Sequence, residues 1–444
     1  MKKLLILMCL MFFITNSVFA ETLKGGINNA ISQSKVNKNA ISIVIKDIQN
    51  GKTVYSLNPN MPVSPASVQK IITLVPAVET LGQDYKFTTK LYKNKNNEFL
   101  IKLGADPYLS SKDLNKIVKY IPKEPKEIYI DDSIIDNNEW GEGWQWDDDL
   151  NELMPKFSAY NLDRNLIELV ITPTIKGFSP EITLMMNYPT TFINNMITDV
   201  KTKYTLKRQN YLSPDIIVAD GTIALNTSDI RKIPVNCPKR YFVLRLSDIV
   251  IDNNISVSGN FNTKKLDKNY TLITQISHDL SNAKTDILKN SNNMISETVF
   301  KLAGGKYVNE TGSFENGLKM LEDYCKKQNI DTSDIKIVDA SGVSKNNLMT
   351  TNFITEFLQK NQELIEPYCA TAGEGTLKNR MLFLKGFLRA KTGTLTNIST
   401  ISGYISTKKS RKYVFSIMIN DSKTKSSDKK ILEEYILRSI YQRG

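Results

Sequence analysis

Three short motifs, separated by long stretches of sequence, constrain the fold of this chain of 444 residues. They are Ser67-Val68-Gln69-Lys70, Ser291-Asn292-Asn293 and Lys391-Thr392-Gly393. A serine hydroxyl is a weak nucleophile until a base takes its proton, and lysine can be that base if burial and a nearby cation lower its pKa. A fold that uses the three motifs together must bring residues 224 and 100 positions apart into one place.

The first motif stands at the start of a predicted helix. Apolar residues recur behind Ser67 with helical spacing, at Val68, Ile71, Ile72, Val75 and Val78. A separation of three residues places Ser67 and Lys70 on the same helix face, and free N–H groups at a helix N-terminus can stabilise an oxyanion. Pro76 removes a backbone hydrogen bond, which predicts a kink there or a helix end near Val75.

The first two motifs are not specific alone. The pattern S-x-x-K recurs at seven other serines, namely Ser32, Ser281, Ser333, Ser406, Ser422, Ser426 and Ser427. The pattern K-T-G occurs once, inside a strand-like run. For Ser291 the alternative is a helix N-cap, and for Lys391 it is a solvated edge-strand lysine. His278 is the only histidine, so a Ser-His-Asp triad would depend on it, and we expect it to be structural.

The first 20 residues read as a secretory signal. Lys2 and Lys3 precede an apolar stretch from Leu4 to Ile14, and Val18-Phe19-Ala20 predicts cleavage after Ala20. The apolar stretch is shorter than the roughly 20 residues that span a membrane, although an uncleaved anchor stays an alternative. We therefore expect a protein exported across the cytoplasmic membrane to the periplasm.

Charge and cysteine content exclude several classes of protein. Without Lys2 and Lys3 the 58 basic residues fall to 56 against 46 acidic ones, a net charge of +10. The lysines are scattered and no nucleic-acid-binding signature accompanies them, so we expect a solvated surface and no nucleic-acid partner. Three cysteines outside the signal, Cys237, Cys325 and Cys369, fit neither a zinc site nor a dense disulfide framework, and they leave any pairing open.

The order of predicted elements suggests one domain interrupted by another. Helical signals and the motifs occupy residues 21–85 and 268–444, whereas residues 86–267 carry short strand-like runs and no catalytic motif. We predict a discontinuous domain with a large, mainly β insertion. The predicted strands are 40–48, 53–57, 98–103, 127–130, 166–172, 241–246, 387–394, 398–406 and 412–420. The predicted helices are 280–289, 294–303 (stopped by Gly304-Gly305), 313–327, 351–359 and 428–441.

The residues around the motifs resemble one family. Pro65 to Lys70, Ser291 to Ile295 and Ala390 to Thr394 are similar to the D-alanyl-D-alanine carboxypeptidase/endopeptidases of the penicillin-binding protein 4 type, serine peptidase family S13. Three more segments share the resemblance: Gly104 to Pro107, Asp339 to Ser344, and Gly373 to Leu377 with Arg380. The resemblance implies an α/β (α+β) fold, in which a β-lactamase/transpeptidase-like catalytic domain has an antiparallel sheet flanked by helices.

The resemblance also implies roles for individual residues. Ser67 would be the nucleophile, Lys70 its proton acceptor, Ser291 the proton relay and Asn293 the substrate clamp. Substrate would be bound by Lys391, Thr392 and Thr394, and by Asp148 facing the stem-peptide side chain. For Asp148 a solvated acidic turn is an equal alternative. Asn292 stands where the family often has an acid, so its side chain is expected to have no catalytic role. Lys345 stands where the family commonly has arginine, which would shift substrate preference if that position contacts the peptide stem.

The expected function is hydrolysis of D-alanyl bonds in peptidoglycan. Both the terminal D-Ala-D-Ala bond and D-Ala-diamino acid cross-links are substrates that the resemblance implies. Stem peptides and β-lactam antibiotics would be the partners, with no cofactor or metal, and a loose association with the membrane surface stays open. Two alternatives are a β-lactamase or esterase that uses the same serine, and a peptidoglycan-binding protein without activity.

Overall fold

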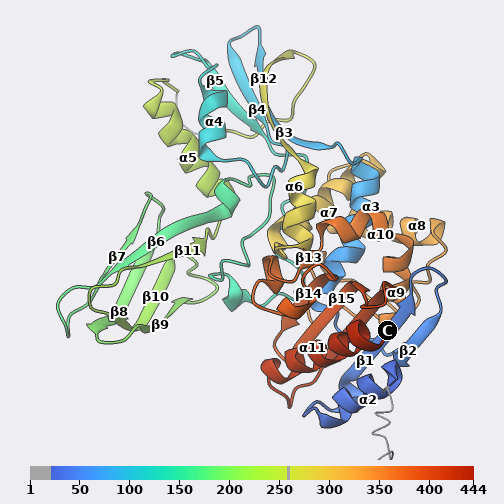
Figure 1. The fold of residues 1–444 in the computed structure, drawn as a ribbon. Helices are drawn as coiled ribbons and strands as arrows, with labels where there is room; N and C mark the ends of the chain where they lie inside the picture. The colour runs from blue at the N-terminus through green and yellow to red at the C-terminus, as the bar shows by residue number, and fades with distance from the viewer. Residues whose placement is uncertain (1–21, 258–260) are drawn as a thin grey trace, which may run out of the picture.

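The computed structural model describes residues 22–257 and 261–444 (Figure 1), so the predicted signal at 1–20 lies outside the described residues. Helices and mostly antiparallel sheets alternate along the chain, which confirms the predicted α+β class. The main domain comprises α2 (Leu23–Gln33), β1 (Ile41–Asp47), β2 (Thr53–Leu57), α3 (Lys70–Leu81), α6 (Leu280–Leu288), α7 (Asn293–Val308), α8 (Phe314–Lys327), α9 (Thr351–Lys360), α10 (Gln362–Ile365), β13 (Ala370–Thr371), β14 (Leu388–Leu395), β15 (Ile398–Ser406), β16 (Lys412–Asn420) and α11 (Ser426–Arg443).

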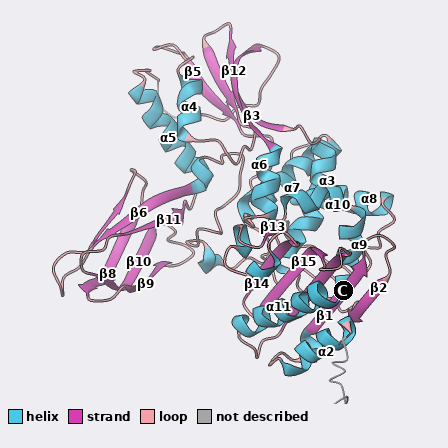
Figure 2. Ribbon diagram, in the orientation of Figure 1, coloured by secondary structure: helices cyan, strands magenta, loops and turns pink. Residues whose placement is uncertain are grey.

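A six-stranded antiparallel sheet in the order β13-β14-β15-β16-β1-β2 forms the centre of the main domain. Strands from both ends of the sequence share it, because Ile43 of β1 lies opposite Ile417 of β16. Alternate residues of a strand face opposite sides. Phe415 and Ile417 accordingly pack in the cluster with α2 and α11, whereas Val414 and Met418 pack in the cluster with α3, α7 and α9. The sheet is therefore covered by helices on both faces (Figure 2).

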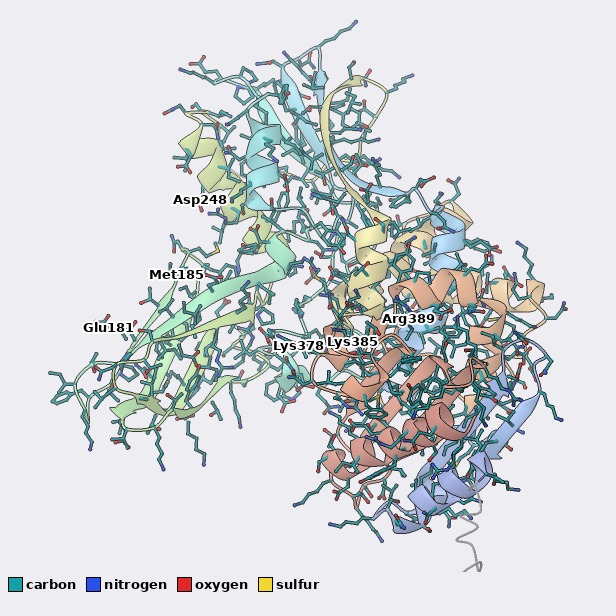
Figure 3. All side chains as sticks on the ribbon, in the orientation of Figure 1. Glu181, Met185, Asp248, Lys378, Lys385 and Arg389 are labelled. Carbon is teal, nitrogen blue, oxygen red and sulfur yellow. The ribbon has the colours of Figure 1, made fainter. Side chains whose placement is uncertain are left out.

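The inserted part of the chain contains β3 (Lys86–Asn94), β4 (Glu98–Lys102), α4 (Ser111–Val118), β5 (Glu127–Asp131), β6 (Leu166–Thr172), β7 (Glu181–Leu184), β8 (Thr191–Asp199), β9 (Lys203–Arg208), β10 (Ile216–Ala224), β11 (Asp229–Pro234), α5 (Pro238–Asp252) and β12 (Tyr270–Asp279). Its strands form three sheets, in the orders β12-β3-β4-β5, β11-β6-β7 and β8-β10-β9. Because β12 pairs with β3 throughout its length, we propose that the inserted module spans residues 86–279 rather than ending at 267. Figure 3 labels Glu181 on β7 and Met185 just after that strand, apart from Arg389 of β14.

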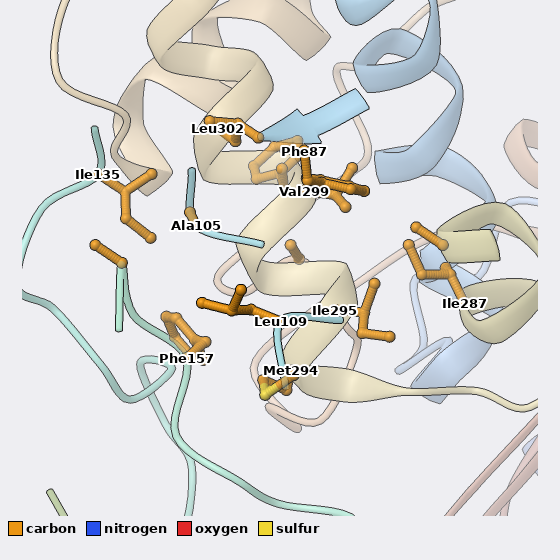
Figure 4. Packing of buried hydrophobic residues seen from close by; sticks show 14 of the residues in the cluster. Phe87, Ala105, Leu109, Ile135, Phe157, Ile287, Met294, Ile295, Val299 and Leu302 are labelled. Carbon is orange, nitrogen blue, oxygen red and sulfur yellow. The ribbon is translucent and has the colours of Figure 1, made fainter. Parts of the chain in front are cut away.

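Helix α7 carries the contact between the module and the main domain (Figure 4). Met294, Ile295 and Val299 on this helix are at most 1% exposed. Phe87, Leu109 and Phe157 of the module belong to the same continuous buried cluster. Burying side chains of this size stabilises by about 1.5–3 kcal/mol each, so the module is held against the helix that follows the second motif.

The predicted strand 241–246 is wrong, because these residues lie inside helix α5. Pro238 occupies the first turn of that helix, where a missing N–H costs nothing. Tyr241, Phe242, Leu246 and Ile249 are buried with helical spacing. A short apolar run fits a strand or a helix, and here packing against the module selects the helix. The other predicted strands and helices are present, with ends shifted by a few residues.

Two predicted helix ends are also wrong. Helix α7 continues through Gly304-Gly305 to Val308, because the glycines serve close packing: a Cβ on Gly304 would lie 2.2 Å from the backbone nitrogen of Gly317 in α8. Helix α3 continues past Pro76 to Leu81, so the alternative of a helix end near Val75 is wrong and the kink stays a prediction. Buried side chains on both sides of Pro76, such as Val75 and Ala77, keep the helix in place despite the missing hydrogen bond.

No described helix is long and apolar enough to span a membrane. The cysteines within the described ranges, Cys237, Cys325 and Cys369, are all free thiols, and the latter two are buried. Burial raises the pKa of both buried thiols to about 12, which makes them unreactive.

Candidate active site

The first motif places Ser67 beside a fully buried lysine. Ser67 lies in a short 3₁₀ turn, Ala66–Gln69, and Lys70 begins α3. The Nζ atom of Lys70, which is 0% exposed, lies 3.0 Å from the Oγ atom of Ser67. It also donates to the Oδ1 atom of Asn293 at 2.7 Å and to the carbonyl of Ser341 at 2.6 Å. The nucleophile and base candidates are thus in hydrogen-bond contact.

Burial lowers the pKa of Lys70 to about 7, opposed by the negative charges of Asp339 and Glu297. A neutral amine can accept a proton, whereas an ammonium cannot. A pKa close to the working pH is what general base catalysis requires. Lys70 can therefore act as a base at neutral pH.

The second motif contributes through two of its three residues. Ser291 adopts a left-handed conformation with φ of 64°, and the N-cap of α7 is Asn292, whose side chain accepts from the N–H of Ile295 at 2.9 Å. The N-cap alternative for Ser291 is therefore wrong, because the cap is its neighbour. Asn293, the first residue of α7, also donates to the carbonyl of Leu153 from the module at 2.9 Å. Asn292 is structural, and Asn293 links Lys70 to the module.

The third motif brings a second buried lysine to Ser291. Lys391, 0% exposed, donates from Nζ to the Oγ atom of Ser291 at 2.8 Å and to the carbonyl of Thr392 at 2.6 Å. The solvated edge-strand alternative for Lys391 is therefore wrong. Burial and the charge of Lys70 lower the pKa of Lys391 well below its usual range. The two lysines disfavour each other's positive charge.

Gly393 allows β14 to approach the nucleophile closely. A Cβ at this position would lie 2.8 Å from the backbone nitrogen of Ser67 and 2.9 Å from the Cβ of Ala66. The contact explains why the motif needs glycine here. It also places the flanking Thr392, which is buried, and Thr394, which is exposed, on the strand that runs past Ser67.

A loop from Asp339 to Ser344 forms the back of the site. Its Ser341 carbonyl accepts from Lys70, and a Cβ on Gly342, where φ is 76°, would lie 2.0 Å from the carbonyl oxygen of Ala66. Asp339 accepts from the N–H groups of Gly342 at 2.7 Å and Ser344 at 2.6 Å. It also accepts from the indole N–H of Trp144, in the module, at 2.7 Å. The sequence identified this segment only as a shared one, without a role.

Asp148 lies apart from the contacts around Lys70, exposed on a short 3₁₀ helix that spans Trp146–Asp148. Its charged neighbours are Asp147 and Lys345. Partial burial and Asp147 raise the pKa of Asp148, and the Lys345 ammonium opposes this. The same loop reaches the site through Trp144 and Leu153, so Asp148 lies on a segment fixed to the site.

His278 takes no part in the site. Its Nδ1 atom lies 2.6 Å from the carboxylate of Asp106 in the module, and its Nε2 atom 3.7 Å from Asp113. Within the described ranges, no group of three or more His, Cys, Asp or Glu residues is arranged to hold a metal ion.

Sequence reasoning missed the carbonyls of Ser341 and Leu153 and the carboxyl group of Glu297. Backbone carbonyls leave no sequence signal, because every residue has one. Glu297 stands four residues after Asn293, which places both side chains on one helix face. That spacing is a sequence signal from which Glu297 can be predicted to lie near Asn293.

The fold thus brings the three motifs to one place, where Ser67 contacts the buried Lys70 and Ser291 contacts the buried Lys391. The model of the D-Ala-D-Ala carboxypeptidase 3 (S13) family matches residues 23–437. The chain belongs to this family and is an enzyme of the carboxypeptidase class.

Relatives of known function agree with this assignment. The D-alanyl-D-alanine carboxypeptidase of Actinomadura sp. (strain R39) is 24% identical over 85% of this chain and 77% of its own length. D-alanyl-D-alanine carboxypeptidase DacB of Haemophilus influenzae is 22% identical over 90% of this chain and 91% of its own. The crystal structure of penicillin-binding protein 4 from H. influenzae matches with a TM-score of 0.82 at 20% identity, covering 94% of this chain and 99% of that one. The predicted fold and family are confirmed.

Proposed function

We propose that this protein is a serine DD-peptidase that hydrolyses the terminal D-Ala-D-Ala bond of peptidoglycan stem peptides through an acyl-enzyme on Ser67. The observation that carries the proposal is the 3.0 Å contact between Ser67 Oγ and Lys70 Nζ, together with the lowering of the Lys70 pKa to about 7. Family membership supplies the substrate class. Lysine, rather than histidine, is the base.

Acylation begins when Lys70 accepts the hydroxyl proton of Ser67 and Oγ attacks the carbonyl carbon of the penultimate D-Ala. The new C–O bond gives a tetrahedral oxyanion, and the C–N bond to the terminal D-Ala then breaks. Lys70 gives up its proton, which reaches the leaving amine through the Ser291 hydroxyl, contacted by Lys391 at 2.8 Å, and Lys70 is neutral again. Water later attacks the ester while Lys70 accepts its proton, and that proton passes to Ser67 Oγ as the ester C–O bond breaks and the shortened peptide leaves. No cofactor enters these steps.

The third motif binds the substrate's terminal carboxylate in this mechanism. Lys391 supplies the positive field, and the hydroxyls of Thr392 and Thr394 donate hydrogen bonds. A bound carboxylate raises the pKa of Lys391, because it stabilises the ammonium. The restored charge on Lys391 then disfavours protonation of Lys70, so binding of the correct substrate prepares the base. The backbone N–H groups of Ser67 and Thr394 form the oxyanion hole, and the Asn293 amide binds the substrate amide.

The same site serves cross-link cleavage, since a D-Ala-diamino acid cross-link presents the same D-Ala carbonyl with a different leaving amine. A β-lactam presents a strained amide with an adjacent carboxylate and acylates Ser67. Support comes from a structure of H. influenzae penicillin-binding protein 4 complexed with a β-lactam, which matches this chain with a TM-score of 0.77 at 18% identity. Cross-link cleavage and reaction with β-lactams would both use Ser67 as the nucleophile.

Asp148 is proposed to bind the ammonium group of the stem-peptide diamino acid. Its support is an exposed carboxylate on a loop fixed to the site. Asp148→Asn should lower kcat/KM for a stem peptide with a free side-chain amine about tenfold, and should leave the peptide without that amine unaffected. Equal losses on both peptides would assign Asp148 to the solvated acidic turn.

The place of action is proposed to be the periplasm. The family acts on cell-wall peptides, and residues 1–20 have the pattern of a cleaved export signal. N-terminal sequencing of the exported protein tests this: a mature chain that begins at Glu21 supports it, and a retained Met1 supports the uncleaved anchor. Release of the protein from membranes by salt would indicate the loose surface association.

The decisive experiment is mass spectrometry of the protein after incubation with benzylpenicillin, with peptide mapping of the adduct and Ser67→Ala as control. A stable adduct on Ser67 that the control lacks supports the proposal. Rapid loss of penicillin without an adduct would identify a β-lactamase. Intact penicillin and no adduct would identify a binding protein without activity.

A further inference from the structure

A buried carboxyl group behind Lys70 has no part in the mechanism above. Glu297 lies on α7 and is 2% exposed. It stands four residues after Asn293, and so one helical turn along the same face. Burying a carboxyl group is costly unless it is hydrogen-bonded or paired. Its bonds therefore indicate what it does for the fold.

Glu297 holds the backbone of the loop from Asp339 to Ser344. Its Oε1 atom accepts from the N–H of Ala340 at 3.0 Å and from the N–H of Ser341 at 2.8 Å, and Oε2 lies 3.0 Å from the same Ala340 nitrogen. The carbonyl of Ser341 is the oxygen that accepts from Lys70 at 2.6 Å. Ser341 thus connects Glu297 to Lys70, because its N–H donates to the carboxyl group and its carbonyl accepts from the amine.

The carbonyl of Ala340, next to these N–H groups, is also fixed. It accepts from the hydroxyls of Thr73 at 2.7 Å, on α3, and Ser296 at 3.2 Å, on α7. The helix that carries Lys70 and the helix that carries Asn293 therefore both hold this residue. Glu297 is the only one of these partners that bonds the N–H of Ser341 among the described contacts.

We propose that Glu297 is a positioning residue for the base: by holding the N–H groups of Ala340 and Ser341, it aims the Ser341 carbonyl at Lys70 and keeps Nζ in reach of Ser67. The inference rests on the proposed function. Besides the Ser341 carbonyl, Nζ of Lys70 has two hydrogen-bond partners, the Ser67 hydroxyl and the Asn293 side-chain oxygen, and the Ser341 carbonyl fixes the direction of the amine. A displacement of about 1 Å at a reacting group can cost on the order of a hundredfold in rate.

Glu297 affects Lys70 through its charge as well as through its hydrogen bonds to the loop. The titratable groups that face Lys70 are Glu297 on α7, Asp339 on the loop and Lys391 on β14. Burial and the Asp339 charge raise the pKa of Glu297. A test must therefore change the length and the charge of the Glu297 side chain in separate variants.

Two variants make that separation. Glu297→Gln keeps the length and one oxygen, which can accept from both N–H groups, but has no charge. Glu297→Asp keeps the acid but is one methylene too short to hold the loop where it is. The matched control is Glu433→Asp, which shortens another fully buried glutamate of the main domain, bonded to Arg380 and Ser399.

The measurement is acylation by benzylpenicillin under single-turnover conditions, resolved into the pre-acylation dissociation constant and the rate constant for acylation. We expect Glu297→Asp to lower the rate constant about tenfold to a hundredfold, with the dissociation constant unchanged because Lys391 and Thr392 are untouched. Glu297→Gln should stay within about threefold of the wild type. Glu433→Asp should lower the melting temperature without changing the rate constant.

Each contrary result has a distinct meaning. A wild-type protein that is not acylated at Ser67 overturns the proposed function itself. Normal wild-type acylation with an unaffected Glu297→Asp variant overturns the positioning role. So does an equal loss in Glu297→Asp and Glu433→Asp, which would show that the loss follows general destabilisation. A large loss in Glu297→Gln with none in Glu297→Asp would assign the effect to charge and also contradict the inference.

Discussion

Two buried clusters of charged side chains in the main domain differ in whether the cation contacts a carboxylate directly. Arg380 donates from Nη2 to the Oε2 atom of Glu433 at 2.8 Å, and Ser399 satisfies the other oxygen at 2.7 Å. Lys70 contacts neither of its carboxylates directly, because the backbone of the loop from Asp339 to Ser344 lies between them. One group is a direct ion pair, and the other is a lysine facing carbonyl, amide and hydroxyl groups.

The difference teaches how this domain separates structure from reactivity. A directly paired arginine stays charged, since its guanidinium does not lose a proton in proteins. A buried lysine without a direct carboxylate has a lowered pKa, about 7 for Lys70, and can exchange a proton with Ser67. Four predictions test this comparison.

The largest effect is expected at Lys70. Lys70→Met removes the group that accepts the Ser67 proton, so acylation by benzylpenicillin should slow by about 10²–10⁴-fold. Mass spectrometry at timed intervals measures this rate. A variant that reacts within tenfold of the wild type would show that another group is the base.

The next effect concerns stability at the other group. Arg380→Met leaves the Glu433 carboxylate buried and unpaired, which should lower the free energy of unfolding by about 3–5 kcal/mol, as measured in urea. The double variant Arg380→Met/Glu433→Gln should recover part of the loss. Acylation by the folded fraction should stay at the wild-type rate. A loss below about 1 kcal/mol would contradict the direct pairing.

The pH dependence of acylation is the third test. Only neutral Lys70 accepts a proton, so the wild-type rate should rise about tenfold per pH unit on the acid side and level off above the Lys70 pKa of about 7. The sign follows from the lowered pKa: at the usual value of 10.5 the rise would continue through neutral pH. Arg380→Met should give the same profile. A rate that still climbs steeply at about pH 9 would refute the lowered pKa.

The smallest effect is expected where the module meets the loop. Trp144→Phe removes the donor to Asp339 while the N–H groups of Gly342 and Ser344 remain, so the free energy of unfolding should fall by about 1.5 kcal/mol. Thermal unfolding measures the loss, with Trp146→Phe as the exposed control. A matching loss in the control would show that the Trp144 bond contributes nothing specific.

The success of sequence reasoning differed between residues for physical reasons. Ser67, Lys70 and Lys391 are predicted from the order of the motifs, the residues around them and one unique tripeptide, and the structure places Lys70 beside Ser67 and Lys391 beside Ser291. The length and apolar content of the segment 241–246 fit a strand and a helix equally, so the sequence does not exclude the incorrect prediction of a strand. Gly304-Gly305 predicts a helix end because glycine is a weak helix former, whereas α7 needs glycine to approach α8 at Gly317.

The sequence by itself determined the family, the α+β class and the residue types of the site, because short motifs and local periodicity are properties of neighbouring residues. Only the tertiary structure decided that the Ser341 carbonyl contacts Lys70, that Glu297 bonds the N–H of Ser341, and that the Leu153 carbonyl contacts Asn293. It also decided that Lys70 has a lowered pKa. Burial and the distance between charges depend on residues hundreds of positions apart, and no local pattern records them.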